Sequence, residues 1–234
     1  MLKPKKKITK KEIKQDNLLT TYAKVTSFYY EHKKRISYVV LAILGVVAIT
    51  VVYINNQRAN NERAAAELGK IFSIYDAGMN DINQYKVAID GMPARSILGL
   101  KAIVENYGST LSGELARFYL ANAYFHLGQF EEAIIHYEKF STNDKLLEAS
   151  ALAGLAACYE AKHEYEPAAS NFESAANAVT NAVSTPDYLN AAARCYGLSG
   201  EKEKAIALYK RIKKEFPTSS YAREVDRYIN QLSA

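Results

Sequence analysis

The stretch LANAYFHLGQFEEAIIHY, residues 120–137, decides the fold of this chain. It holds a small residue, an aromatic ring, a turn glycine, a second small residue and a second ring: Ala121, Tyr124, Gly128, Ala133 and Tyr137. The pattern returns 35 residues later at Ala156, Tyr159, His163, Ala168 and Phe172, and 37 residues after that at Ala193, Tyr196, Gly200, Ala205 and Tyr209. Two antiparallel helices approach closely at alanines, and rings fill the space between neighbouring pairs. The period therefore predicts stacked helical hairpins.

More helical sequence flanks these repeats. After polar residues 55–61, an apolar face comprises Leu68, Ile71, Phe72, Tyr75 and Met79. We expect a loop of about 15 residues with Gly78, Gly91 and Pro93, and then a second helix with Ser96, Leu100 and Ile103 that ends near Tyr107 and Gly108. These segments predict a degenerate first hairpin. At the other end, Ser219 or Ser220 caps a helix with the apolar stripe Ala222, Val225, Ile229 and Leu232.

Residues 36–54 form an uncharged run of 19 residues that predicts a single transmembrane helix. At 1.5 Å per residue this helix would span roughly 28 Å, close to the hydrocarbon thickness of about 30 Å. Lys33, Lys34 and Arg35 adjoin its start, so the positive-inside rule keeps the N-terminus cytoplasmic and exports the rest. A buried core helix and a cleaved signal peptide fit less well, because the run is long, uncharged and preceded by an extended basic segment.

The charge is distributed unevenly along the chain. Residues 1–35 hold 11 Lys and Arg against 3 Asp and Glu, a net charge of +8, whereas the whole chain carries +5 and the remainder therefore −3. This asymmetry argues against a nucleic-acid-binding body and for a tail that meets an anionic partner, of which a membrane surface is the nearest candidate. Leu18, Tyr22, Val25 and Tyr29 share one helical face. This face lies either on the anionic leaflet or in a solvated, partly helical tail, and we expect Lys3–Lys11 to be disordered.

These observations predict an all-α chain: a helical-hairpin solenoid of about four repeats with a C-terminal capping helix, preceded by one transmembrane helix. The expected organisation is a basic cytoplasmic tail with a partly amphipathic helix, the transmembrane helix, a stalk with the degenerate first repeat, three clear repeats, and the cap. The corresponding ranges are 1–35, 36–54, 55–113, 114–217 and 218–234.

The repeats resemble the tetratricopeptide repeat family. In the first clear repeat the matching residues are Leu120, Ala121, Tyr124, Gly128, Phe130, Ala133 and Tyr137. The second supplies Leu155, Ala156, Tyr159, Tyr165, Ala168, Phe172 and Ala175, and the third Ala193, Tyr196, Gly200, Ala205, Tyr209 and Pro217. His163 replaces the turn glycine, Lys202 replaces the turn aromatic residue, and the first clear repeat lacks the closing proline. The resemblance covers residues 114–217 closely and 58–113 loosely.

The layout is similar to that of bacterial inner-membrane tetratricopeptide proteins beside the Sec translocon. This resemblance implies a periplasmic adaptor or holdase that acts on newly exported proteins, although cell-division and outer-membrane assembly factors share similar repeats. We therefore expect a non-enzymatic scaffold that binds proteins or peptides. The alternative is a structural component of an envelope or division assembly that forms homo-oligomers through the face from Leu68 to Met79.

The resemblance also implies which side chains line the concave face of the solenoid. They are Leu115, Phe118, Asn122, Phe125 and His126, then Ser150, Ala153, Ala157, Glu160 and Ala161, then Asp187, Asn190, Arg194, Gly197 and Leu198. Family members that grip a carboxylate have a lysine where this chain has Phe118. We therefore expect an extended or helical apolar peptide in the groove. The alternative, that Phe118 and Phe125 pack against the preceding hairpin, stays open.

The sequence offers little for catalysis, metal or cofactor binding. Cys158 and Cys195 occupy equivalent repeat positions, which lie about 10 Å apart in stacked hairpins, beyond the roughly 7 Å that a disulfide spans, so two free buried thiols are expected. His32, His126, His136 and His163 lack metal-ligand spacing. Ser199 and Lys202 spell S-x-x-K on a solvent-exposed turn without the accompanying motifs of serine acyl-enzymes. We expect no catalytic, cofactor-binding or metal-binding residue.

Overall fold

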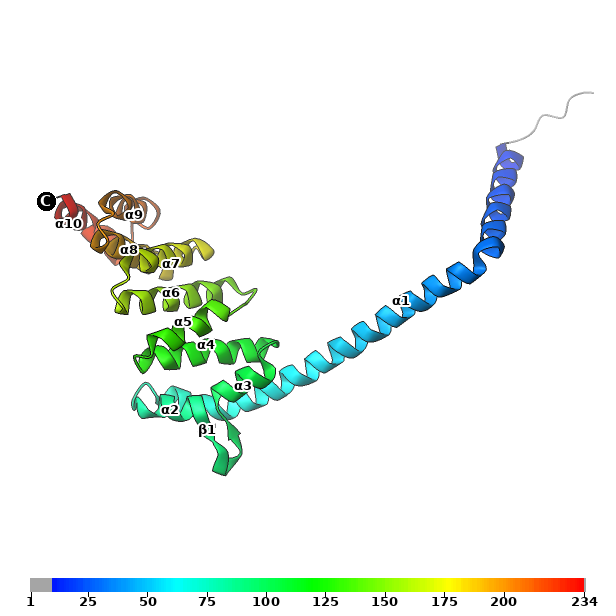
Figure 1. Cartoon of the computed structure of the whole chain (residues 1–234). Helices are drawn as coiled ribbons and strands as arrows, with labels where there is room; N and C mark the ends of the chain where they lie inside the picture. Colours follow the sequence, from blue (N-terminus) through cyan, green and yellow to red (C-terminus); the bar gives the residue numbers. More distant parts are fainter. Residues whose placement is uncertain (1–9, 234) are drawn as a thin grey trace, which may run out of the picture. The chain divides into compact units, whose positions relative to one another are not determined.

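A computed structural model of the chain describes residues 10–233, with side chains from residue 19 onward (Figure 1). Residues 1–9, most of the segment expected to be disordered, and the side chain of Leu18 lie outside the described residues. The chain divides into two compact units, Met1–Asn56 and Gln57–Ala234, which are described here one at a time.

One continuous helix, α1, extends over 68 residues from Lys10 to Ala77. It includes the expected tail helix, the apolar run and the first helix of the second unit. The polar residues 55–61 are helical as well, because they contain neither glycine nor proline and nothing interrupts the backbone hydrogen bonds. Within the part of the chain that the structure describes, α1 alone is long and apolar enough to cross a membrane.

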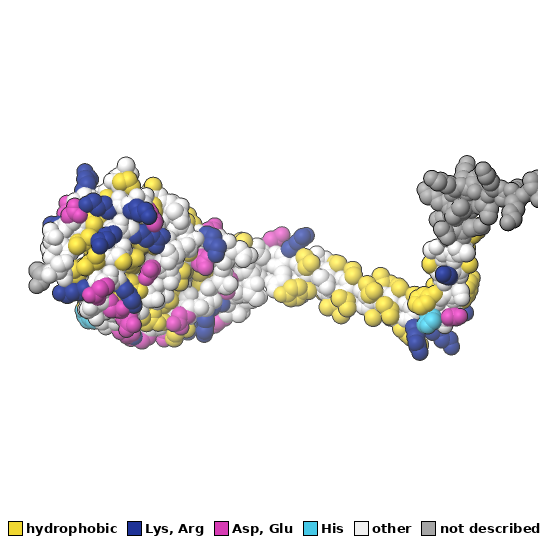
Figure 2. All heavy atoms as spheres, turned by 90° about the horizontal axis from the view of Figure 1, so that it is seen from above, with side chains coloured by type: hydrophobic (Ala, Val, Ile, Leu, Met, Phe, Trp, Pro, Cys, Tyr) yellow, Lys and Arg dark blue, Asp and Glu magenta, His cyan; other side chains and the backbone are white. Residues whose placement is uncertain are grey.

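The apolar run is uncovered in its unit. The large apolar side chains from Tyr38 to Ile54 are between 43% and 72% exposed. They form the yellow band along the helix in Figure 2, between the charged groups at its two ends. A helix that presents apolar side chains on all sides suits a lipid environment rather than water.

The second unit is a stack of antiparallel helices (Figure 1). The expected repeats are three helical hairpins, each made of two consecutive helices, followed by the capping helix; this part of the prediction is confirmed. The hairpins are α4 (Leu111–His126) with α5 (Phe130–Lys139), α6 (Lys145–Ala161) with α7 (Tyr165–Ala178), and α8 (Ser184–Leu198) with α9 (Lys202–Glu215). The cap is α10 (Ser220–Ser233), which packs against α9 and α8.

The degenerate first hairpin differs from the prediction. The expected long loop contains a helix, α2 (Asn83–Asp90), and a two-stranded antiparallel ladder of β1 (Gly91–Met92) and β2 (Ile97–Leu98) around the 3₁₀ turn η1 (Pro93–Arg95). α2 forms because Tyr85, Ala88 and Ile89 bury one face. Ser96 lies in the turn with φ 53°, so α3 begins at Leu100 and ends at Tyr107.

The repeating small and aromatic residues form the core. All six repeat alanines are completely buried: Ala121, Ala133, Ala156, Ala168, Ala193 and Ala205. Tyr137, Phe172 and Tyr209, the rings of the second helices, are 4–7% exposed. Gly154 of α6 lies directly against the Tyr137 ring, where a Cβ atom has no room. The sequence pattern is therefore a packing pattern, as predicted.

The turn between the two helices of each repeat has one backbone geometry. Gly128, His163 and Gly200 all have positive φ, at 73°, 62° and 88°. In each case the next residue donates its N–H to the carbonyl of the repeat tyrosine, over 2.8–2.9 Å, at Tyr124, Tyr159 and Tyr196. His163 thus adopts a left-handed conformation that costs an ordinary side chain roughly 1–2 kcal/mol. Its Nδ1 atom lies 2.8 Å from the Tyr165 hydroxyl, a contact that offsets part of this cost.

The structure decides between the two candidate caps of α10. The Ser219 hydroxyl accepts a hydrogen bond from the backbone N–H of Ala222 over 3.2 Å, so Ser219 is the capping residue. Val225 is completely buried, and Ala222, Ile229 and Leu232 pack against the same core cluster. The last apolar face of the solenoid is thereby covered.

Candidate peptide-binding groove

The expected groove residues lie on the first helices of the three clear hairpins. Leu115, Phe118, Asn122, Phe125 and His126 are on α4, Glu160 is on α6, and Asp187, Asn190 and Arg194 are on α8. The structure places only some of them around hollows. They gather in two regions, one near the start of the second unit and one near its end.

The first region is a hollow of about 790 Å³ at the junction of α1, α2 and α4. Its lining residues are Tyr75, Gly78, Met79, Asn80, Ile82, Tyr85, Asn122 and His126. Met79 and Ile82 are large apolar residues that remain 79% and 53% exposed at its rim. Sequence reasoning found Asn122 and His126 but missed the other six, because they lie in the degenerate hairpin. The apolar face that includes Tyr75 and Met79 was the available signal.

A series of contacting aromatic rings connects this hollow with the middle of the solenoid. Tyr85 lies parallel to His126 with centroids 4.8 Å apart, and Tyr75 lies 5.4 Å from Tyr85 and 4.9 Å from Tyr119. Phe118 continues the series, 5.9 Å from Tyr119 and 5.5 Å from Phe140. Aromatic pairs at these separations attract one another beyond simple burial.

The wall of the hollow is uncharged but includes several polar side chains. The Tyr137 hydroxyl donates a hydrogen bond to Oδ1 of Asn122, which fixes that amide at the edge of the hollow. Burial lowers the pKa of His126 below its ordinary value of 6.5, so this ring is neutral at pH 7. Burial is the main reason why the pKa of Tyr75 lies far above its ordinary value, and the neighbouring Tyr85 raises that pKa further. None of the eight lining residues therefore carries a charge at neutral pH.

Phe118 and Phe125 are half-buried on α4. Phe118 contacts the rings of Tyr137 and Phe140, with centroids 6.3 and 5.5 Å apart, and Phe125 lies 5.7 Å from Phe130. Both rings thus pack against residues of their own hairpin and the turn that follows it. Each side chain remains partly exposed.

The second region lies where α10 closes the solenoid. A hollow of about 340 Å³ is lined by Asn190, Ala193, Arg194, Gly197, Leu198, Tyr209, Tyr228, Gln231 and Leu232. Arg194 is ion-paired with Glu160 through two hydrogen bonds, one of them 2.9 Å from Nη2 to Oε2. These two expected groove residues neutralise each other and connect α8 to α6. Asp187 lies instead beside Tyr221, whose pKa is raised first by burial and then by that carboxylate.

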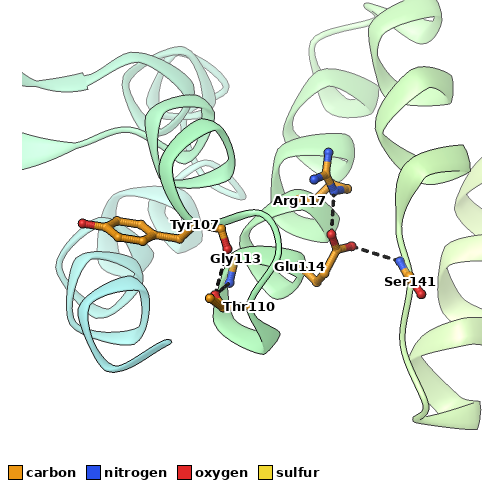
Figure 3. Close-up of polar contacts among 6 residues, drawn as sticks. All are labelled: Tyr107, Thr110, Gly113, Glu114, Arg117 and Ser141. Carbon is orange, nitrogen blue, oxygen red and sulfur yellow. Dashed lines mark hydrogen bonds and ion pairs between the residues drawn. The ribbon is translucent and has the colours of Figure 1, made fainter. Parts of the chain in front are cut away.

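Glu114 holds the helix that carries most of the groove residues (Figure 3). Its Oε1 atom accepts a hydrogen bond from Arg117 Nε over 3.1 Å, and its Oε2 atom accepts one from the backbone N–H of Ser141 over 3.0 Å. At the start of α4, the Thr110 hydroxyl donates to the Tyr107 carbonyl over 2.8 Å and accepts from the Gly113 N–H over 3.1 Å. These bonds attach α4 to α3 on one side and to the turn after α5 on the other.

The cysteine and serine side chains considered for chemistry are either buried in the core or hydrogen-bonded to the backbone. Cys158 and Cys195 are both free and buried, as predicted, and burial raises their pKa values to about 12 and about 11. The Ser199 hydroxyl donates to the Tyr196 carbonyl over 3.0 Å at a helix end. Across the residues with described side chains, no cluster of three His, Cys, Asp or Glu is placed to hold a metal ion.

Comparison with known proteins agrees with this architecture. Residues 115–141 and residues 191–219 each match the tetratricopeptide repeat family. No curated protein gives a significant match. A crystal structure of nearly identical TPR-like repeats, from a protein of Podospora anserina described as a kinesin light chain, superposes with a TM-score of 0.55. It is 17% identical and the match covers 72% of this chain and 85% of that one, a likeness of fold alone. Two segments of the chain therefore match tetratricopeptide repeats, and its solenoid is similar in fold to a known structure of such repeats.

Proposed function

We propose that this protein is a single-pass, membrane-anchored scaffold without catalytic activity, whose repeat domain binds a protein or peptide on the extracytoplasmic side. By its layout it is an adaptor or holdase in a bacterial inner membrane, close to the site of protein export. The observation that carries this proposal is the uncovered apolar run of α1 in the same chain as a tetratricopeptide solenoid. Tethering would raise the local concentration of a weak binder near its partner.

The orientation follows from the charges next to the apolar run. Three basic residues, Lys33, Lys34 and Arg35, directly precede the run. Among the seven residues that follow it, Arg58 is the only basic one. Basic residues are retained on the cytoplasmic side of a membrane. We therefore place residues 1–35 in the cytoplasm and residues 57–234 outside it.

The uncharged hollow between α1, α2 and α4 is our candidate for the binding site. Its rings, the exposed Met79 and Ile82, and the fixed Asn122 amide offer apolar contact together with peptide-type hydrogen bonding. These features suit an apolar side chain of an extended segment rather than a charged terminus. Phe118 extends the same surface along the solenoid.

The test of the groove is crosslinking in intact membranes followed by purification of the chain with its partners. Met79→Asp puts a charge at the rim of the hollow without disturbing the core, and Leu111→Asp is the matched control at another exposed position. We expect Met79→Asp and Phe118→Ala to lose partners that Leu111→Asp retains. Unchanged partners in Met79→Asp, Phe118→Ala and Arg194→Ala would refute the groove.

The test of orientation is protection from protease in sealed cells from which any outer envelope has been removed. External protease should digest the repeat domain and leave the N-terminal tail. A repeat domain that survives until the membrane is opened would show that it is cytoplasmic.

Self-association through the face from Leu68 to Met79 is less well supported. Leu68 and Ile71 are 8% and 0% exposed because α2, α3 and α4 cover them within the same chain. Phe72 and Met79 remain exposed, at 40% and 79%. A face already used in this way leaves little apolar area for a second copy.

A further inference from the structure

The segment of α1 before the apolar run carries its own set of exposed apolar side chains. Between residues 19 and 30, six large apolar or aromatic residues are 52–71% exposed: Leu19, Tyr22, Val25, Phe28, Tyr29 and Tyr30. We call residues 19–35 the arm. No helix of the described chain covers it, and proteins in water rarely leave so many rings uncovered.

The arm has two different faces. Successive residues of an α-helix are rotated by about 100°, so Tyr22, Val25 and Tyr29 lie along one side. Lys24, Ser27, Glu31 and Lys34 lie along the opposite side, Leu19, Phe28 and Tyr30 lie between the two sides, and Lys33 lies near the side of Tyr22. An apolar side with aromatic rings and a polar side with lysines are typical of a helix that lies in the plane of a membrane surface.

The arm also changes direction relative to the apolar run. Figure 1 shows α1 bending within its dark-blue N-terminal part, and Figure 2 shows Lys and Arg side chains gathered at this bend. The Thr26 hydroxyl donates to the carbonyls of Tyr22 and Ala23 over 2.8 and 3.0 Å, and the His32 ring lies 3.2 Å from the Phe28 carbonyl. Threonine hydroxyls that bond to carbonyls of the preceding turn often accompany helix bends.

The charges indicate which surface the arm meets. It holds Lys24, Lys33, Lys34 and Arg35 against the single carboxylate of Glu31. Basic groups next to a membrane-spanning helix are attracted to a leaflet that contains anionic lipids. We infer that the arm is a membrane-surface helix, with the side of Tyr22, Val25 and Tyr29 in the headgroup region of an anionic leaflet. This inference rests on the proposed function, because it requires residues 36–54 to span the bilayer.

The experiment compares two single-cysteine labels on the full-length chain in vesicles. Val25→Cys lies on the apolar side and Ser27→Cys on the polar side, and both positions are exposed. Each variant is labelled with a polarity-sensitive fluorophore and reconstituted into phosphatidylcholine vesicles with or without phosphatidylglycerol. The unsubstituted chain is the background control, because Cys158 and Cys195 are buried and have raised pKa values.

With phosphatidylglycerol present, the label at position 25 should emit at shorter wavelength and resist quenching by aqueous iodide, while the label at position 27 stays quenchable. The difference should shrink without the anionic lipid. Equal quenching at the two positions in both lipid mixtures would overturn the inference, and so would protection at position 25 that is independent of lipid charge.

Alkaline carbonate extraction of the same vesicles separates this inference from the proposed function. A chain that carbonate releases from the vesicles would show that the anchor itself is wrong. A chain that stays in the membrane with equal quenching at the two positions would show that only the arm has been misplaced.

Discussion

Two parts of the single helix α1 show how the same kind of residue meets opposite surroundings. Ile49, in the apolar run, is 72% exposed, and Ile71, further along the same helix, is completely buried. Both are isoleucines in regular helix. The difference lies in what packs against them, since α2, α3 and α4 cover Ile71 within its own unit and no described element covers Ile49.

This comparison bears directly on the membrane. Thirteen large apolar side chains between residues 38 and 54 are exposed. Leaving one such side chain in water rather than in an apolar medium costs about 1.5–3 kcal/mol. So many exposed apolar side chains in one run favour an apolar surrounding, which no described element of the chain supplies.

The largest effect is expected when charged residues are placed in the apolar run. Leu44→Asp together with Val47→Asp should prevent stable insertion, because each carboxylate at the centre of a membrane helix costs about 2.5–3.5 kcal/mol. The measurement is the fraction of the chain that stays with membranes during carbonate extraction. Asn55→Asp with Asn56→Asp, just after the run, is the matched control and should insert normally. Normal retention of the central variant would mean that the run does not span the bilayer.

Replacing one leucine by alanine in the repeats and one in the apolar run tests the difference in burial. Leu120 is completely buried and Leu41 is 61% exposed. Leu120→Ala should lower the free energy of unfolding of the repeats by about 2–5 kcal/mol, because it leaves a cavity in the core. Leu41→Ala should change it by less than about 0.5 kcal/mol. Urea unfolding of the full chain in detergent, followed by near-ultraviolet circular dichroism of the tyrosines, measures both, and similar losses would contradict the assignment.

Alkaline pH should lower the stability of the repeats, because it removes protons from buried cysteine and tyrosine side chains. Burial raises the pKa of Cys195 to about 11, of Cys158 to about 12 and of Tyr196 to about 12. The folded state holds protons that the unfolded chain releases, so stability is unchanged below about pH 8 and falls as the pH rises above the ordinary thiol pKa. Each affected group contributes up to about 1.4 kcal/mol per pH unit.

The measurement is the urea midpoint between about pH 8 and about pH 10.5. Replacing both cysteines by alanine should reduce this loss without removing it, since Tyr196 still titrates. A midpoint that does not move with pH would contradict the burial of these groups.

The smallest expected effect compares the turns of the repeats. His163→Gly should raise the free energy of unfolding by up to about 1 kcal/mol, because glycine adopts positive φ without strain while the contact with Tyr165 is lost. Gly200→Ala should lower it by about 1 kcal/mol at the equivalent position. Thermal unfolding of the two variants gives the comparison. Loss of stability in His163→Gly would show that the histidine contact outweighs the backbone strain.

The repeated pattern allowed much of the fold to be predicted. The hairpins α4 to α9, the buried alanines and the cap lie where the spacing placed them, because each repeat residue meets the same neighbour in every hairpin. The first hairpin was predicted poorly. Its α2 helix and the β1–β2 ladder come from segments without a repeating partner, so no periodicity marked them.

The candidate site was only partly predictable. Asn122 and His126, which the family resemblance named, line a hollow, but the other six lining residues belong to α1, α2 and the turn between them. The pairing of Arg194 with Glu160 joins residues 34 positions apart on different hairpins. Such contacts depend on how far one hairpin turns relative to the next, a quantity that sequence spacing does not contain.

Local order along the chain was sufficient to identify the repeats, the apolar run and the basic tail, because helix formation, turn geometry and charge depend on neighbouring residues. The folded arrangement was needed to show that α1 is continuous, that the Leu68 and Ile71 face is covered, and that uncharged rings surround a hollow beside Asn122. These properties arise from side chains distant in sequence, whose packing is set by the whole stack of helices.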